Sequence, residues 1–135
     1  MQTTPATPFE RFGGHEFFDL LIARFYAGVA EDPQLRPMYP EADLGPAAER
    51  LQLFLEQYWG GPTTYSQLRG HPRLRMRHQP FPVDAAAHDA WLRHMRVALD
   101  EAAPAVGMAA EDEAELWDYL SRAAFSMVNT YPAPD

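Results

Sequence analysis

The sequence predicts an all-α protein that folds as a single domain. Apolar residues recur at spacings of three and four in several long segments, which is the pattern of amphipathic helices. No segment shows the sustained period-two alternation of a β-strand, and no internal repeat divides the chain. A length of 135 residues suits one domain, and 47% hydrophobic with 13% aromatic content is enough for a core.

The first long helix is predicted over residues 15–29. Residues 1–8 are rich in threonine and proline, so we expect them to be disordered and the folded domain to span residues 9–131. Gly13 and Gly14 permit a tight turn before the helix. Its apolar stripe comprises Phe17, Phe18, Leu21, Ile22, Phe25, Tyr26 and Val29.

A short turn and a second long helix follow. Asp32-Pro33 resembles a cap followed by a first-turn proline, and it opens a turn that later prolines prevent from growing. Tyr39 lies at the end of this turn. The next helix begins at Gly45-Pro46 and ends at Gly60-Gly61. One face of it carries Ala47, Leu51, Phe54, Leu55 and Tyr58.

A helix of about two turns is predicted between Pro72, which can start it, and Pro80, which must end it. It carries His78 at its end. So short a helix gains little from its own hydrogen bonds, and a bound cofactor would supply the outside partner that it needs. We interpret His78 as a candidate metal ligand, although a lone histidine is more often a side chain satisfied within the protein.

Two more long helices complete the chain. Asp84 is an N-cap for a helix to Ala103, which Pro104 and Gly107 close. The last helix runs from about Glu111 to Val128, and its acidic first turn complements the helix dipole. These segments predict about four substantial helices and two short ones, arranged as two antiparallel pairs that cross with a pocket between them.

Composition limits the partners and the compartment. The net charge of −8 disfavours nucleic acid. The chain has no cysteine, which excludes disulfides, thiolate metal sites and covalently attached haem. No run of about 18 apolar residues and no basic-plus-apolar leader is present, so we expect a cytoplasmic protein without membrane insertion.

The basic residues of the chain are all arginines, and several of them cluster. Arg69, Arg73, Arg75 and Arg77 lie close together in an otherwise acidic chain. They are either a solvated helix face or an anchor for the carboxylates of a ligand, which suit the guanidinium fork.

The other histidines do not complete a recognisable metal motif. His71 and His78 are seven positions apart and can face one way, whereas His88 and His94 are six apart and do not share a helix face. Zinc needs three or four ligands at suitable spacing, so the sequence disfavours a zinc hydrolase.

Tyr26, Tyr39 and Trp91 lie within or beside apolar stripes on three separate elements. They are either ordinary core aromatics or donors that converge on one pocket. Their spacing leaves both interpretations open.

Several short segments together carry a family resemblance. They are Gly13-Gly14, Arg24-Phe25-Tyr26, Met38-Tyr39-Pro40, Glu49-Arg50-Leu51, Phe54-Leu55-Glu56-Gln57-Tyr58-Trp59-Gly60-Gly61-Pro62, Arg69-Gly70-His71-Pro72-Arg73-Leu74-Arg75-Met76-Arg77-His78 and Asp89-Ala90-Trp91-Leu92. In these segments, over about residues 9–129, the chain resembles a truncated haemoglobin of group II. The resemblance implies a two-over-two helical sandwich around haem, in agreement with the predicted helices.

The resemblance implies that the cofactor is haem b with His78 as the proximal iron ligand. The other ring nitrogen of such a ligand needs an acceptor, and the Leu74 carbonyl four residues earlier is within reach. Arg50, Tyr65 and Arg77 are the implied contacts for the haem propionates.

On the distal side, Tyr26, Tyr39 and Trp91 match the polar cluster of group II. Such donors stabilise the negative charge that a bound ligand draws outward. Ala47 stands where many globins carry a distal histidine, so that side stays open to ligands from outside. The remaining implied haem contacts are the apolar residues Leu51 and Phe54.

The resemblance implies a haem b protein that binds dioxygen and related diatomic ligands. We expect redox activity toward nitric oxide or peroxide, as a nitric oxide dioxygenase or a peroxidase, with electrons from a separate reductase. The alternative is a dioxygen sensor or carrier without turnover. Outside the family, a cofactor-free interaction module would use the arginine cluster as its contact surface. The physiological ligand and the oligomeric state, including a homo-oligomer, stay open.

Overall fold

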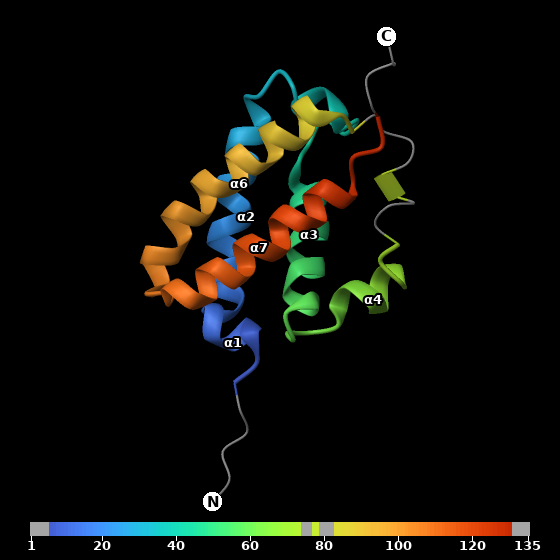
Figure 1. The fold of residues 1–135 in the computed structure, drawn as a ribbon. Helices are drawn as coiled ribbons and strands as arrows, with labels where there is room; N and C mark the ends of the chain where they lie inside the picture. Colours follow the sequence, from blue (N-terminus) through green and yellow to red (C-terminus); the bar gives the residue numbers. More distant parts are fainter. Residues whose placement is uncertain (1–5, 74–76, 79–82, 131–135) are drawn as a thin grey trace, which may run out of the picture.

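Two antiparallel helix pairs, packed across each other, form the computed structural model in Figure 1. Helices α2 (Gly14–Ala30) and α3 (Gly45–Tyr58) make one pair, and α6 (Ala85–Val106) and α7 (Ala110–Ser126) make the other. The structure describes residues 6–73, 77–78 and 83–130, and within these ranges every regular element is a helix. The predicted all-α architecture of two crossed pairs is therefore confirmed.

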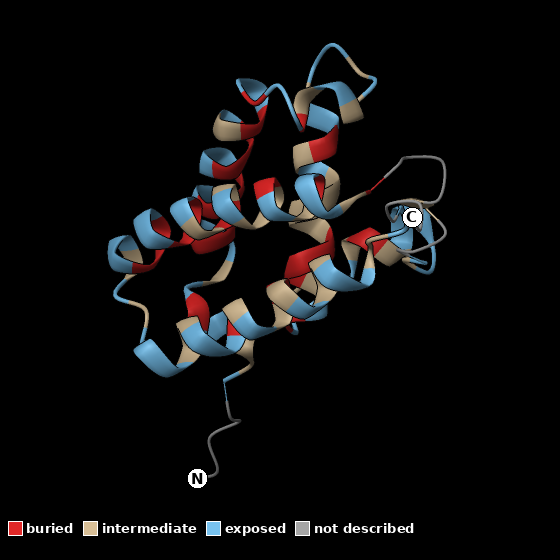
Figure 2. Cartoon of the chain, turned by 45° about the horizontal axis from the view of Figure 1, so that its top comes forward, coloured by how far each residue is buried: buried red, intermediate tan, exposed pale blue. Residues whose placement is uncertain are grey.

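The core lies between the two pairs and is centred on α2. Figure 2 shows the buried residues on the inward faces of the helices. Every residue of the predicted stripe of α2 is buried, and the stripe joins Met95, Ala98 and Leu99 of α6 and Leu116 and Leu120 of α7 in one apolar cluster. No helix in these ranges is both long enough and apolar enough to cross a membrane.

The short helices α1 (Pro8–Phe12), η1 (Arg36–Met38) and α4 (Thr64–Arg69) are described besides these pairs, and the sequence pattern predicted only the turn that contains η1. This is the turn predicted after Asp32, whereas α1 and α4 were not predicted. They have five and six residues, too few for an apolar period to show. The start of α1 has a local cause, because Thr7 Oγ1 accepts a hydrogen bond from the Glu10 amide at 3.2 Å.

Two sequence predictions about the long helices were wrong. Helix α6 continues beyond Ala103 to Val106 and holds Pro104 in its last turn, and it ends where Gly107 takes the left-handed conformation and the Met108 amide donates to the Ala103 carbonyl at 2.9 Å. Tyr58 was predicted to share a face of α3 with Ala47, Phe54 and Leu55, which are buried, but it is 52% exposed. Its ring stacks on Tyr119 of α7 with the centroids 4.1 Å apart, so the contact between the helices is made at the surface.

The tight reversal after α3 places α4 beside it. The Gly61 amide donates to the Glu56 carbonyl at 2.8 Å, and a Cβ at Gly61 would lie 2.8 Å from that oxygen and 2.9 Å from the Phe9 ring. Only glycine permits so close an approach. Two hydrogen bonds between Gln57 and Ser66, at 2.7 and 2.9 Å, then fix α4 against α3.

Asp32 is a buried carboxylate that joins the end of α2 to α6. One of its oxygens accepts hydrogen bonds from the amides of Gln34 and Leu35 at 2.7 and 3.3 Å, and the other contacts His94 Nε2. The His94 contact, followed by the Gln34 amide, lowers the pKa of Asp32 below its ordinary value of 3.8. The carboxylate therefore stabilises the folded state wherever it is charged.

We expect Asp32→Ala to lower the free energy of unfolding at neutral pH by about 1.5–3 kcal/mol, because buried donors lose a charged acceptor. The folded-state pKa is depressed, so this contribution is complete above pH 3.8 and is lost as the pH falls through the folded-state value. Denaturant titrations of both proteins at neutral and acidic pH measure it. Asp118→Ala, a change at an exposed carboxylate of α7, is the control. Equal stability of wild type and Asp32→Ala at neutral pH would contradict the assignment.

Candidate functional site

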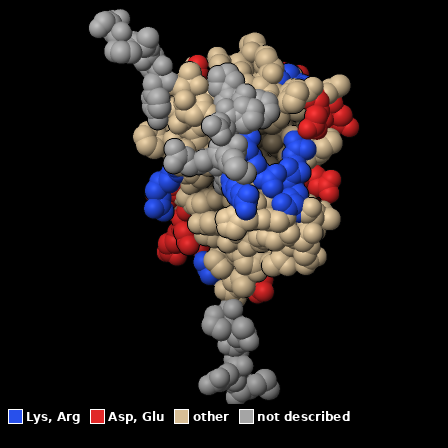
Figure 3. All heavy atoms as spheres, turned by 90° about the vertical axis from the view of Figure 1, so that its right-hand side faces the viewer, with Lys and Arg blue, Asp and Glu red and all other residues tan. Residues whose placement is uncertain are grey.

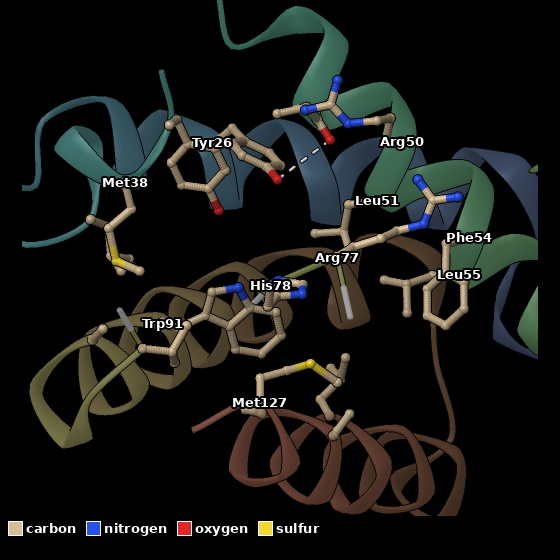
Figure 4. Close-up of a pocket in the computed structure, with 18 of the residues that line it drawn as sticks. Tyr26, Met38, Arg50, Leu51, Phe54, Leu55, Arg77, His78, Trp91 and Met127 are labelled. Carbon is tan, nitrogen blue, oxygen red and sulfur yellow. Dashed lines mark hydrogen bonds between the residues drawn. The ribbon is translucent and has the colours of Figure 1, made fainter. Parts of the chain in front are cut away.

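A cavity of about 510 Å³ opens between the helix pairs. Figure 4 shows its walls, with Leu51 and Phe54 of α3 on one side and Met127, which follows α7, on the other. Most of the lining is apolar. A volume of this size and an apolar surface with a few polar groups are typical of a cofactor site.

The cavity brings together the site residues that the sequence indicated. They come from separate elements and all line the same space: Tyr26, Tyr39, Ala47, Arg50, Leu51, Phe54, Tyr65, Arg77, His78 and Trp91. The predicted acceptor Leu74 and the predicted helix end at Pro80 lie outside the described residues. Tyr26 belongs to the buried core, with Tyr39 and Trp91 packed against it, and all three also line the cavity, so both interpretations of these aromatic residues stay open.

The aromatic donors lie along one wall. The rings of Tyr26 and Tyr39 meet edge to face with centroids 5.7 Å apart, and Phe25 packs edge to face on Tyr26 and on Trp91, at 4.9 and 5.3 Å. The Tyr26 hydroxyl donates a long hydrogen bond of 3.4 Å to the Ala47 carbonyl. Because α2 supplies both Phe25 and Tyr26, this helix sets the position of the wall.

Burial keeps these phenols protonated. It raises the pKa of Tyr26 far above the ordinary value, and the neighbouring Tyr39 adds to the shift. Burial also raises the pKa of Tyr39, partly offset by its hydrogen bond with Tyr26. Both hydroxyls therefore remain donors at neutral pH, and the indole of Trp91 can only donate.

His78 enters the cavity from a segment that the end of the chain holds in place. Arg77 and His78 are helical and half-buried, and Figure 4 shows the imidazole directed into the cavity. The Asn129 side chain donates to the His78 carbonyl at 3.2 Å and accepts from the Val83 amide at 2.8 Å. Asn129 thus fixes both ends of the connection around residues 79–82, a role that no sequence pattern indicated.

Arginines surround the mouth of the cavity. Figure 3 shows their side chains gathered beside a hollow on this face. Arg77 donates to the carbonyls of Pro72 and Arg69 at 2.7 and 3.1 Å, and the guanidinium groups of Arg69 and Arg77 lie about 6 Å from the Tyr65 ring centroid, at 5.9 and 6.0 Å. Arg50 pairs with Glu41 at 3.1 Å. The rim therefore carries arginines that are held by the Tyr65 ring, by backbone oxygens and, for Arg50, by the Glu41 carboxylate.

Sequence reasoning missed one wall of the cavity. Helix α7 was predicted as an amphipathic helix, but its part in the cavity was not; the α7 segment contributes Tyr119, Leu120, Ala123, Ala124 and Met127. The small alanines of its stripe were the available signal. Further lining residues that were not predicted are Leu35, Met38, Leu55, Val83, Ala87 and His88.

Tyr119 of this wall is a partly buried phenol. Burial, with a smaller effect from Tyr58, raises the pKa of Tyr119 to about 12.

These residues fit the haem group that the sequence predicted. Apolar walls suit a flat macrocycle, the His78 imidazole suits iron, and the arginine rim suits propionate carboxylates. Among the described residues, no group of three or more His, Cys, Asp and Glu side chains lies close enough to hold a metal ion without such a macrocycle.

Comparisons with known proteins match nearly the whole chain. A family model described as a bacterial-like globin matches residues 7–129. The chain is 41% identical over 128 residues to group 2 truncated hemoglobin YjbI of Bacillus subtilis, covering 95% of this chain and 92% of that protein.

Solved structures agree with this match. A thermostable hemoglobin from Thermobifida fusca superposes with a TM-score of 0.89 at 57% identity, covering 94% of this chain and 100% of that one. The group II truncated hemoglobin of Bacillus anthracis gives 0.88 at 37% identity, covering 97% of both chains. A truncated oxygen-avid haemoglobin from Bacillus subtilis gives 0.82 at 40% identity, covering 92% and 100%.

Proposed function

The chain belongs to the bacterial-like globin family, whose fold here is the two-over-two truncated globin, and on that premise we propose that it is a haem b protein for dioxygen and related diatomic ligands. The family implies haem-based ligand binding. The b type is proposed because no cysteine thiol is present to attach the macrocycle covalently, which excludes a c-type haem. Bound haem supplies an iron that coordinates diatomic ligands and exchanges electrons.

His78 is the proposed proximal ligand. Its imidazole points into the cavity, and Asn129 holds the backbone carbonyl of the same residue. Arg50, Tyr65 and Arg77, at the mouth, are the proposed partners of the propionates. Leu51 and Phe54 exclude water from the interior.

Tyr26, Tyr39 and Trp91 are the proposed donors to a ligand in the cavity. Besides its hydrogen bond with Tyr39, the Tyr26 hydroxyl donates to the Ala47 carbonyl at 3.4 Å, and a bond so long can be exchanged for one to a better acceptor. Ala47 has only a methyl group, so a second small molecule has room beside the first. Several donors aimed at one small acceptor predict slow release.

Slow release favours redox chemistry over delivery. A relative at 40% identity is described as oxygen-avid, which supports the same expectation for this chain. We propose turnover of nitric oxide or peroxide, with a separate reductase as electron donor. The converging donors carry this proposal, because they hold one reactant in place while another enters and can polarise an oxygen–oxygen bond.

The ligand role of His78 is tested by His78→Gly. This variant should lose the ferrous spectrum of an imidazole-ligated haem, and added imidazole should restore it, because the glycine leaves room for the free ring. His71→Gly, a change at an exposed histidine of the same segment, should leave the spectrum unchanged. A wild-type spectrum for His78→Gly without imidazole would rule out this ligand.

Trp91→Phe tests whether the Trp91 indole donates a hydrogen bond to the bound ligand. Loss of one charge-assisted hydrogen bond, worth about 1.5–3 kcal/mol, should speed dioxygen release roughly 10- to 150-fold in stopped-flow measurements. Trp117→Phe, a change outside the cavity on α7, is the control. The assignment fails if both variants release dioxygen at the wild-type rate.

The proposed activity is tested by rapid mixing. The dioxygen-loaded ferrous protein is mixed with nitric oxide, the ferric protein is mixed separately with hydrogen peroxide, and dioxygen release is measured alone. We expect slow release and fast reaction in at least one assay. Fast release with negligible reactivity in both would instead favour a carrier or a sensor.

A further inference from the structure

We propose that His94 is a positioning residue for ligand retention: through Asp32 it holds the segment that carries Tyr39 against the helix that carries Trp91. His94 does not line the cavity, so it would act on the ligand only through other residues. The inference rests on the proposed binding of dioxygen, because it concerns how long a ligand stays.

A continuous series of hydrogen bonds joins Asp32 to Tyr39. The Asp32 side chain accepts from the amides of Gln34 and Leu35, and its carbonyl accepts from the Arg36 amide at 2.9 Å. The Tyr39 amide donates to the Arg36 carbonyl at 3.2 Å, and the Arg36 guanidinium donates to the Tyr39 carbonyl at 3.0 Å. Movement of Asp32 is therefore transmitted to the backbone of Tyr39.

The other end of the connection is helix α6. His94 Nε2 contacts the second Asp32 oxygen, and Trp91 lies three residues earlier, close to the same face of the helix. One contact between residues 62 positions apart thus links two of the three elements that present the proposed donors to the cavity, the Tyr39 segment and α6. Arg93 approaches the same oxygen at 3.6 Å, but its side chain is 63% exposed and should contribute little.

Helix α2 is shaped to admit the His94 ring. A Cβ at Gly28 would lie 2.5 Å from His94 Nδ1, closer than real side chains approach. The imidazole therefore lies close against α2 at Gly28, and the absence of a side chain at Gly28 leaves room for the ring in its contact with Asp32. This close fit is independent of the hydrogen bonds and points to the same residue.

Loss of the His94 contact should allow the Tyr39 segment to shift relative to Trp91. A donor that points at the ligand only part of the time stabilises it less, so we expect roughly three- to tenfold faster dioxygen release from His94→Ala. His94→Gln retains a side-chain N–H donor of similar reach and should restore most of the wild-type rate.

The experiment measures dioxygen release from the haem-loaded protein by stopped flow. It compares wild type, His94→Ala, His94→Gln and the control Asp100→Ala, which removes an exposed carboxylate from the same helix. The His94→Ala change is repeated in a Tyr39→Phe background. If His94 acts through Tyr39, its effect should largely disappear there, which a general loss of stability would not produce.

Amide hydrogen exchange gives a second readout that does not depend on the ligand. In the haem-loaded ferric protein, His94→Ala should speed exchange at the Gln34 and Leu35 amides, while the Asp100→Ala control should not. Unchanged release from His94→Ala, or an equal effect of it in the Tyr39→Phe background, overturns the proposal. A wild-type protein that binds no diatomic ligand contradicts the proposed function instead, so the two failures are distinguishable.

Discussion

The crossing of α2 over α6 is the contact on which the rest of the molecule depends. Helix α2 has one wide buried face, and its middle packs across α6 in the centre of the core. The same helix presents Phe25 and Tyr26 to the cavity, and α6 presents Trp91 to it. Because protein interiors are densely packed, a small shift at this crossing cannot be absorbed locally. The packing of the core therefore also determines the position of the aromatic wall of the cavity.

The aromatic wall of the cavity places polar hydroxyl groups, those of Tyr26 and Tyr39, in a buried position. Buried hydroxyls are costly unless they are hydrogen-bonded, and the Tyr26 hydroxyl has a long bond to the Ala47 carbonyl and a hydrogen bond with Tyr39. The raised pKa values of Tyr26 and Tyr39 show how strongly the site disfavours a negative phenolate. Both hydroxyls therefore stay protonated at neutral pH, which is what their proposed role as donors to a small acceptor in the cavity requires.

Local sequence patterns were enough to predict the long helices, because apolar residues spaced by three and four positions can be recognised within a single segment. They were not enough for α1 and α4, which are shorter than two full periods. The arrangement of the candidate site was harder to predict from sequence patterns. The position of Tyr39 depends on a turn whose course is set by Asp32 and His94, which are far apart in sequence. The wall from α7 was visible as a stripe, but periodicity cannot distinguish a residue that fills a core from one that borders a cavity. Family resemblance, and not spacing, brought these residues together in advance.

Gly28 bears on attempts to make this protein more heat-resistant. It lies inside α2, where glycine is the weakest helix former after proline, and replacement by alanine is a common stabilising change worth about 0.4–1 kcal/mol. Here the added methyl group would occupy the space of the His94 ring. A design based on helix propensity alone would choose alanine at a site where the tertiary fit requires glycine. Consensus-based engineering should therefore leave position 28 unchanged and seek its gains on the outer faces of α6 and α7.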